Sequence, residues 1–584
     1  MDPSPKLLDA LFFPTAAYHP DLPLPENRQQ KEGLIDWSRS FLNPATRIET
    51  LDSVPTPTWD IDGAEPDGIQ FWALPRFTRG HPPQRIDVYV GPTDIEAHPS
   101  LRPLANATVV MVGKDACARL DIARHILRAL EYWSSRIVDF ERLYMSMPFG
   151  SQICIKDIKP SILEMEITFV ADYALERQWL SATQLKEMWQ LPADSWPSEL
   201  DLNEIEFIRQ MHDSISLVTI SKRHGAAQYI FKAASTDVKL LYLELRNLLE
   251  LFPHPNILSR PIYVVTKKVR FGGKQGLCGV ILEYLPLGTL GRFLACHKAP
   301  AHPMTDRLKW ARQATEALIH IHSQCGKFYA DLNMSNIGVK HSKDGGSPDL
   351  VIIDFDQRTG LYNWSPPEVY YVDYIERLAR GHIDSAVPEE YRAIMRSLFP
   401  NWTPPSRHTR YHEAFAGYSI GWLALSKHER DAAMVYMAGK LLWCIFENVE
   451  EITEPAIYAA FRINPSLTFP EFKATPPEMR DCIRRCTAGA PEWEGRRQPF
   501  VIRQGRLYPR AKISSAEGQF KLFKEVQSAA RWWWKEEIED ARRFLRAREK
   551  DQDSLEDIGQ RPKLEEVLGM ILSVTERAQL GPHS

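Results

Sequence analysis

Glycine is scarce in this chain of 584 residues, which has 30 glycines against 43 prolines. A motif that depends on a run of glycines is therefore expected to be missing or degenerate. The eight cysteines are scattered and form no C-x-x-C pair, so the usual spacing of a zinc site is missing. Scattered cysteines favour a reducing compartment.

An excess of charge of one sign and long apolar runs are also missing. Lys and Arg total 71 and Asp and Glu total 75, which argues against a nucleic-acid or anionic-membrane partner. The longest apolar stretch, 434–446, is shorter than the ~18 residues of a spanning helix and contains Lys440, so it predicts a buried helix. The N-terminus lacks a secretory pattern. A cytoplasmic or nuclear location is expected.

What is present begins with an α+β pattern over residues 1–205, of which about the first 65 are rich in proline. Short β-branched or aromatic runs predict strands, and apolar positions at helical spacing predict helices. Ser181 is expected to be the N-cap of the last helix. The strands are predicted at 69–77, 85–91, 107–113 and 161–173, and the helices at 30–42, 116–145 and 181–190.

From about residue 206 the chain alternates strands with a helix and then becomes mostly helical, which is the order of a two-lobed α+β domain. Thr305 is expected to be the N-cap of a helix over 305–324, and two short apolar strands follow that helix. The earlier strands are predicted at 215–220, 228–234, 260–271 and 277–285, with a helix at 237–252.

Two acidic segments carry the chemistry. Asp331 and Asn336 lie five residues apart on a predicted loop, and Asp354 ends a buried strand. Burying an isolated carboxylate is costly, and a cation would offset that cost. Mg²⁺ suits the arrangement because it takes oxygen ligands and is usually bound by one or two carboxylates together with substrate phosphates.

These segments resemble the protein-kinase family. The family patterns H-R-D-L-x-x-x-N and D-F-G correspond here to Tyr329-Ala330-Asp331-Leu332 with Asn336, and to Asp354-Phe355-Asp356. Further segments on both sides of these two motifs occur in the family's order. They are Lys232 in QYIFK, Glu244 ahead of HPNI (254–257), ILEYLPLGTL (281–290), SPPE (365–368) and QRPKLEEVLGMI (560–571). The segment CTAGAPEW (486–493) adds a resemblance to the divergent kinase-like proteins abundant in filamentous fungi.

The resemblance implies a bilobal protein-kinase-like fold over residues 206–575, preceded by the N-terminal α+β domain. The small lobe would span 206–285 and the large lobe 286–575, with residues 576–584 as a tail. Helical insertions are expected near 369–430 and 487–557.

The resemblance also implies ATP- and Mg²⁺-dependent phosphoryl transfer to a protein Ser/Thr hydroxyl. Asp331 would be the catalytic carboxylate, and Asn333 stands where the family has a lysine. The other implied roles are nucleotide binding by Lys232, Glu244, Glu283, Leu285 and Gly225, Mg²⁺ binding by Asn336 and Asp354, and a structural ion pair between Glu368 and Arg561. Glu250 and Arg496 are rivals of Glu244 and Arg561.

Departures from the family pattern keep two alternatives open. Gly225 is the single glycine of the expected phosphate loop, Asn333 removes a cation, and Asp356 replaces the glycine of D-F-G. These changes favour a pseudokinase that acts as a binding or scaffold module. A small-molecule kinase of the aminoglycoside or choline type also tolerates a residue other than lysine at that position.

Overall fold

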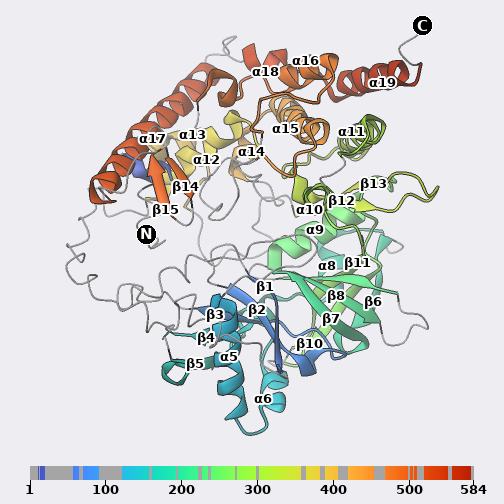
Figure 1. Ribbon diagram of the computed structural model, residues 1–584, viewed down its shortest axis with the longest axis vertical. Coiled ribbons are helices and arrows are strands. Elements are labelled where there is room, and N and C mark those ends of the chain that lie inside the picture. Colours follow the sequence, from blue (N-terminus) through green and yellow to red (C-terminus); the bar gives the residue numbers. More distant parts are fainter. Residues whose placement is uncertain are drawn as a thin grey trace.

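The structure is a computed structural model of mixed α+β class, in which the placement of part of the chain is described. Figure 1 shows the two large sheets in one half of the molecule and the long helices in the other. The described residues are 11, 13–19, 57–64, 70–90, 121–156, 159, 161–192, 195–220, 227–234, 238–269, 272–297, 301–356, 363–381, 389–404, 419–452, 467–496, 500–503, 506–509, 519–549 and 556–580.

The N-terminal sheet has five strands in chain order, β1 to β5. Its neighbours are antiparallel except β3 and β4, which are parallel and are joined through α5. Alternating residues such as Ile86, Val88 and Ile153 face α5 and form a separate core with it. The elements are β1 (Trp59–Ala64), β2 (Gln70–Pro75), β3 (Ile86–Val90), α5 (Asp121–Ser135), α6 (Phe140–Ser146), β4 (Ser151–Ile155) and β5 (Ile167–Val170).

Several predictions for this region need correction. The single helix predicted over 116–145 is two helices, α5 and α6, because the chain turns at Asp139, whose φ is +54°. The strand predicted over 161–173 shortens to β5, preceded by a 3₁₀ turn at 162–164. The helix predicted at 30–42 and the strand at 107–113 lie outside the described residues.

The second sheet has six strands in the order β6-β10-β11-β9-β8-β7. Strand β6 belongs to this sheet because it pairs in parallel with β10, and β6 starts at Ser198. The sheet therefore begins before the domain boundary expected at residue 205. Helices α7 and α8 share its core through Leu175, Trp179 and Leu185. The elements are α7 (Ala174–Gln178), α8 (Ala182–Trp189), β6 (Ser198–Asp201), β7 (Ile205–His212), β8 (Ile215–Ile220), β9 (Tyr229–Ala233), α9 (Val238–Glu250), β10 (Tyr263–Lys268) and β11 (Gln275–Glu283).

The helical half is built around α15, whose apolar stretch is buried as the sequence predicts. Helix α11 begins one residue early, with Pro303 rather than Thr305 as its N-cap, and continues as a π turn over 320–324. The elements are α10 (Leu290–Cys296), α11 (Met304–Ile319), β12 (Ile337–Lys340), β13 (Asp349–Ile352), α15 (Lys427–Glu447), α16 (Pro477–Cys486), α18 (Glu556–Gln560) and α19 (Leu564–Leu580).

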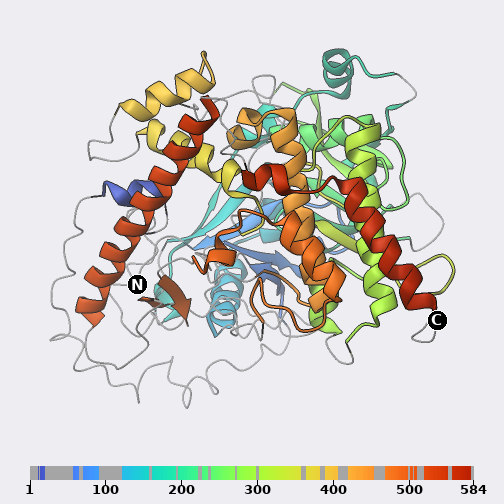
Figure 2. The same ribbon diagram turned by 90° about the horizontal axis from the view of Figure 1, so that it is seen from above.

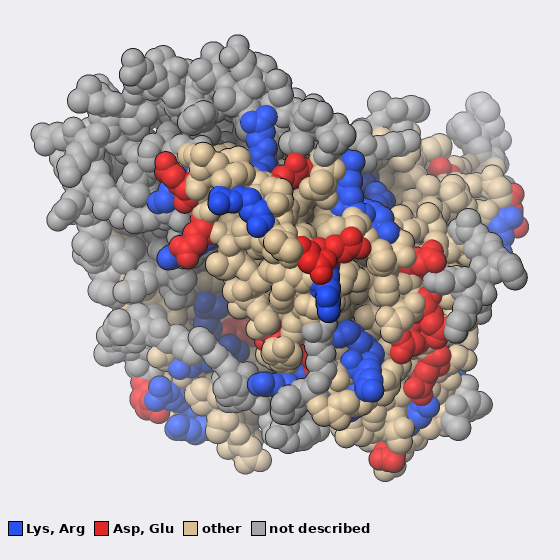
Figure 3. All heavy atoms as spheres, turned by 90° about the horizontal axis from the view of Figure 1, so that it is seen from below, with Lys and Arg blue, Asp and Glu red and all other residues tan. Residues whose placement is uncertain are grey.

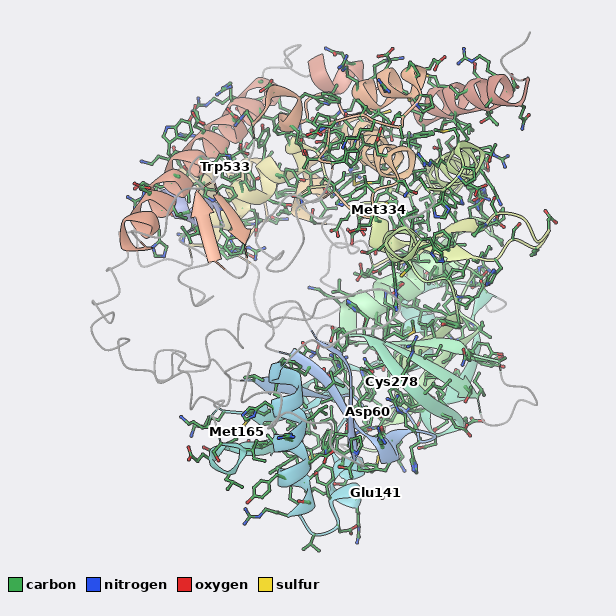
Figure 4. All side chains as sticks on the ribbon, viewed as in Figure 1. Asp60, Glu141, Met165, Cys278, Met334 and Trp533 are labelled. Atoms are coloured by element: carbon green, nitrogen blue, oxygen red, sulfur yellow. The ribbon has the colours of Figure 1, made fainter. Side chains whose placement is uncertain are left out.

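The two expected insertions pack together into a third core, to which Ala16 and Ala17 also contribute. Trp533 and Trp534 of α17 are buried there, and η1 lies against the same helix (Figures 2 and 4). The second insertion is not purely helical, because it also contains the hairpin β14–β15. The elements are η1 (Pro14–Ala17), α12 (Pro367–Arg380), α13 (Glu390–Leu398), α14 (Ile420–Ala424), β14 (Phe500–Arg503), β15 (Arg506–Pro509) and α17 (Gln519–Glu549).

The outer surface carries charges of both signs. On the face drawn in Figure 3, Lys and Arg side chains are interspersed with Asp and Glu among the described residues. Within the part of the chain that is described, none of the helices combines the length and the apolar character needed to cross a bilayer.

Candidate functional site

A buried lysine of β9 joins carboxylates from two distant elements. The Nζ atom of Lys232 lies 2.6 Å from Oε2 of Glu244 on α9 and 2.8 Å from Oδ1 of Asp354, just after β13. Strand register fixes the lysine opposite Val280 of β11, in the middle of the six-stranded sheet. Only 8% of Lys232 is exposed to solvent. Residues 122 positions apart therefore meet at one ammonium group.

The charges around this lysine do not balance. Burial by itself lowers the pKa of Lys232, but the carboxylates of Asp354, Glu244 and Asp356 raise it overall. Burial raises the pKa of Glu244 to about 7, with Asp354 and Asp356 acting in the same direction against Lys232. A raised pKa favours the charged form of the lysine but the neutral form of the glutamate. The lysine lies among several anions, whereas the buried glutamate lies beside one cation and two like charges.

Helix α9 also holds the backbone that carries Asp354. The Phe355 N–H donates to Oε1 of Glu244 at 3.4 Å, and the Nδ2 of Asn247 donates to the Phe355 carbonyl at 2.8 Å. Asn247 lies three residues after Glu244, so both side chains project from one face of the helix. The rival Glu250 points elsewhere and binds Lys327 and Arg246, at 2.6 and 2.7 Å.

Tyr329 fixes the same segment from the other side, a role that sequence reasoning missed. Its hydroxyl donates to the carbonyls of Ile353 and Asp354, and its ring meets the Phe355 ring edge-on with centroids 5.3 Å apart. In the sequence, Tyr329 is notable only because the kinase motif has a histidine at this position. Asp354 itself has a φ of +62°, a conformation that Asp tolerates better than most residues and that often occurs at functional positions.

Asp331 belongs to the same electrostatic group. Burial raises its pKa to about 7, and the nearby charges of Asp354 and Asp356 add to that effect. The Nδ2 of Asn333 donates to Oδ1 of Asp331 at 3.0 Å, and the Nδ2 of Asn336 donates to the Asp331 carbonyl at 2.8 Å. The amide groups thus hold the loop in shape. We call Lys232, Glu244, Asp331, Asp354 and Asp356 the Lys232 group.

The donor chemistry of this group fits a hard divalent cation. Asp354 and Asn336 are joined through the backbone, because the Ile353 N–H donates to the Asn336 carbonyl at 3.0 Å. Carboxylate and amide oxygens are Mg²⁺ ligands, and Mg²⁺ usually takes one or two of them together with phosphates. The described residues contain no ready-made cluster of three or more His, Cys, Asp or Glu side chains for a metal. A Mg²⁺ ion held here would therefore need phosphate ligands as well.

Two of the residues expected to bind the nucleotide, Glu283 and Leu285, lie at the end of β11. Glu283 is exposed and is the last residue of the strand, opposite Tyr229 of β9. Leu285 is buried, and its carbonyl accepts a hydrogen bond from the Gly288 N–H at 3.0 Å. In the described part of the chain, no hydrogen bond or ion pair links either residue to the Lys232 group. Gly225 lies outside the described residues.

A second buried ion pair joins α12 to the segment before α19. Nη1 of Arg561 lies 2.5 Å from Oε1 of Glu368, as expected from the sequence, and Nη2 lies 3.3 Å from Oε2. The rival Arg496 instead pairs with Glu537 and Asp540 of α17. This pair is separate from the Lys232 group and ties the first insertion to the C-terminal helix.

No protein-family model and no curated protein sequence matches this chain. The basis for assigning chemistry is therefore the geometry of the Lys232 group together with the order of its motifs. Figure 4 labels Met334, three residues after Asp331, on the side of the helical half that faces the sheets. The loop bearing Asp331 thus faces the half of the molecule that contains Lys232.

Proposed function

We propose that this chain is a divergent, protein-kinase-like phosphotransferase with a bilobal catalytic part, which transfers phosphate from ATP to a protein Ser/Thr hydroxyl. The observation that carries the proposal is the contact of one buried ammonium, on Lys232, with Glu244 and Asp354 from two other elements. Together with Asp331, these groups follow the chain order of the kinase motifs. The Glu368–Arg561 pair supports the same interpretation of the helical half.

Each residue of the group has a role in this proposal. Lys232 would bind ATP phosphates while Glu244 orients it, and Asp331 would orient the attacking hydroxyl and accept its proton. Asn336 and Asp354 would hold Mg²⁺, which supplies charge neutralisation for the phosphates when it is bound. A pKa near 7 gives Asp331 a proton affinity suited to exchange with a substrate hydroxyl at neutral pH.

Transfer of labelled phosphate from ATP in the presence of Mg²⁺ tests the proposal. We expect Asp331→Asn and Asp354→Asn each to lower the rate about a hundredfold or more, the scale seen when one transition-state contact is removed. Asp349→Asn is a matched control, because Asp349 begins the strand that precedes Asp354 but pairs with Lys309 and Gln313. Equal activity of Asp354→Asn and Asp349→Asn would contradict the catalytic assignment.

A pseudokinase is the second candidate, favoured by the contacts of Asn333. Asn333 replaces the family's lysine, and its amide is committed to Asp331 and to the Ser335 N–H. This function predicts Mg²⁺-dependent nucleotide binding that Asp354→Asn weakens, with no transfer by the wild type. Offering both a protein mixture and small alcohols as acceptors separates the third interpretation, a small-molecule kinase, which would phosphorylate only the alcohols.

A further inference from the structure

The segment before β6 lies against the six-stranded sheet and against the helix that carries Glu244. We call residues 174–189 the brace; they comprise α7, the link Trp179–Ser181 and α8. Trp179 is fully buried, and a Cβ atom added at Gly276 of β11 would lie 2.8 Å from the Cβ of Trp179. This close approach explains why β11 has a glycine at that position. The brace therefore packs directly on β11.

Polar contacts hold the brace on both sides of Trp179. The buried carboxylate of Glu176 accepts hydrogen bonds from the Phe149 N–H and from Lys267 of β10. The ammonium of Lys274 donates to the Trp179 carbonyl at 2.7 Å. Downstream, a capping box between Ser181 and Gln184 starts α8, which buries Leu185 and Trp189 in the same core. The link is thus fixed at both ends.

One tyrosine of α9 connects the brace to the sheet. The hydroxyl of Tyr242 accepts a hydrogen bond from the Leu180 N–H at 2.8 Å and donates to the Leu277 carbonyl at 2.9 Å. The Leu277 N–H in turn donates to the Leu180 carbonyl at 2.8 Å. Leu277 precedes Cys278, which Figure 4 labels within the six-stranded sheet. Three elements therefore meet at one buried hydroxyl group.

Tyr242 lies two residues before Glu244, so the two side chains leave α9 about 200° apart. Glu244 projects toward Lys232, and Tyr242 projects toward the brace. A hydrogen-bonded anchor on the far side of the helix resists rotation that would separate Glu244 from Lys232. We propose that Tyr242 is a positioning residue, through which the brace acts in cis to hold Glu244 against Lys232. The inference rests on the proposed function for its consequence, but its geometry is testable without turnover.

The test compares full-length Tyr242→Phe with Tyr144→Phe. Tyr144 is a matched control because it is fully buried and its hydroxyl has no hydrogen-bond partner among the described residues. The readout is the rate at which an amine-acylating reagent modifies Lys232, followed by mass spectrometry. We expect Tyr242→Phe to raise this rate roughly fivefold to tenfold, the factor corresponding to one buried hydrogen bond, and Tyr144→Phe to leave it unchanged.

A double variant separates positioning from general loosening. If Tyr242 acts through Glu244, then Tyr242→Phe adds no further increase to Lys232 modification in a Glu244→Gln background. A further increase of the same size in that background overturns the inference, as does a Tyr242→Phe protein that unfolds more easily but leaves Lys232 protected. If the wild type transfers no phosphate yet Lys232 responds as expected, the proposed function falls and the positioning role stands.

Discussion

The Lys232 group and the Arg561–Glu368 pair are both buried, but their charges are balanced differently. Arg561 meets a single carboxylate through two contacts, donates to the Ala488 carbonyl at 2.9 Å and stacks on Tyr436 at 4.9 Å. Lys232 shares its one positive charge with Glu244 and Asp354 and is influenced by Asp356 as well. One site has a cation satisfied by its surroundings, whereas the other has more carboxylates than its lysine can neutralise.

This difference determines how the two sites are expected to respond to substitution. A balanced buried pair contributes to stability only when both partners are present, and it offers nothing to a further ion. Burial raises the pKa values of Glu244 and Asp331 to about 7, and the neighbouring carboxylates of Asp354 and Asp356 act in the same direction, so ionising these two groups costs stability in the folded protein.

Removing the cation of the balanced pair should have the largest effect. Arg561→Ala leaves Glu368 buried without a partner, so we expect the free energy of unfolding to fall by about 3–5 kcal/mol. Urea unfolding followed by circular dichroism measures this loss. Arg312→Ala, which breaks a surface pair with Glu316, is the control and should change the free energy by less than about 0.5 kcal/mol. A loss no larger than the control's would mean that the pair is not structural.

Two glutamates on α9, one in the Lys232 group and one outside it, should differ in their effect on the kcat/KM for ATP. Glu244→Gln removes the partner that orients Lys232, and we expect the kcat/KM for ATP to fall about tenfold to a hundredfold. Glu250→Gln weakens the half-buried pairs with Lys327 and Arg246, away from the Lys232 group, and should leave kcat/KM within about twofold. Steady-state kinetics with varied ATP makes the comparison. Equal losses in the two variants would remove Glu244 from the site.

The Lys232 group should make stability fall as pH rises. Burial raises the pKa of Asp331 to about 7, so the folded protein holds this proton more tightly than the unfolded chain does. Its stabilising contribution is complete below the unfolded pKa of about 4 and is lost as pH rises through about 7. We expect Asp331→Asn to flatten the fall by up to about 1.4 kcal/mol per pH unit in that window.

Unfolding in urea at several pH values between 4 and 8 measures this slope. Asp349→Asn is the control. Although burial raises the pKa of Asp349, hydrogen bonds from Lys309 and Gln313 lower it overall. Its contribution is therefore constant above about pH 4 and is lost only as pH falls below that value, so removing it should leave the slope between pH 4 and 8 nearly unchanged. A slope unchanged by Asp331→Asn would show that Asp331 is not held in its acid form.

The smallest expected effect is an increase in the free energy of unfolding. Asp354→Asn removes one anion from the surplus, keeps a residue that tolerates a φ of +62°, and should raise the free energy of unfolding by about 1 kcal/mol. Urea unfolding of this variant beside the wild type measures the change, without added nucleotide or Mg²⁺. A loss as large as that of Arg561→Ala would show that the Lys232 group is balanced after all.

Much of the secondary structure could be predicted because its cause is local. Ser181 and Gln184 form the capping box of α8, and the apolar run of α15 is buried as its composition predicts. The predicted helix boundaries were wrong where the backbone conformation, and not the side-chain pattern, determined the start or end of a helix. The left-handed Asp139 divides a continuous helical pattern, and Pro303 starts α11 ahead of the threonine that has the better capping side chain.

The four residues Lys232, Glu244, Asp331 and Asp354 were predictable as a set, because the sequence places them in the order of the kinase motifs. Their contacts were less predictable, since they depend on atoms that meet across many intervening residues. Tyr329 is an example: in the sequence it is only a departure from the family's histidine, yet its hydroxyl anchors the Asp354 backbone. The contribution of α7 and α8 to the second core was also missed, because the partner strands of that sheet follow much later in the chain.

The pairing of Glu368 with Arg561 has a consequence for how the protein is made. The two residues are 193 positions apart in the sequence. During synthesis from the N-terminus, α12 leaves the ribosome long before its buried cation does. Until then Glu368 must remain hydrated, so the first insertion can form helices but cannot settle into its final packing. Completion of the helical half is therefore expected to wait until Arg561 has been synthesised and has left the ribosome, and chaperone binding at the ribosome should persist until that point.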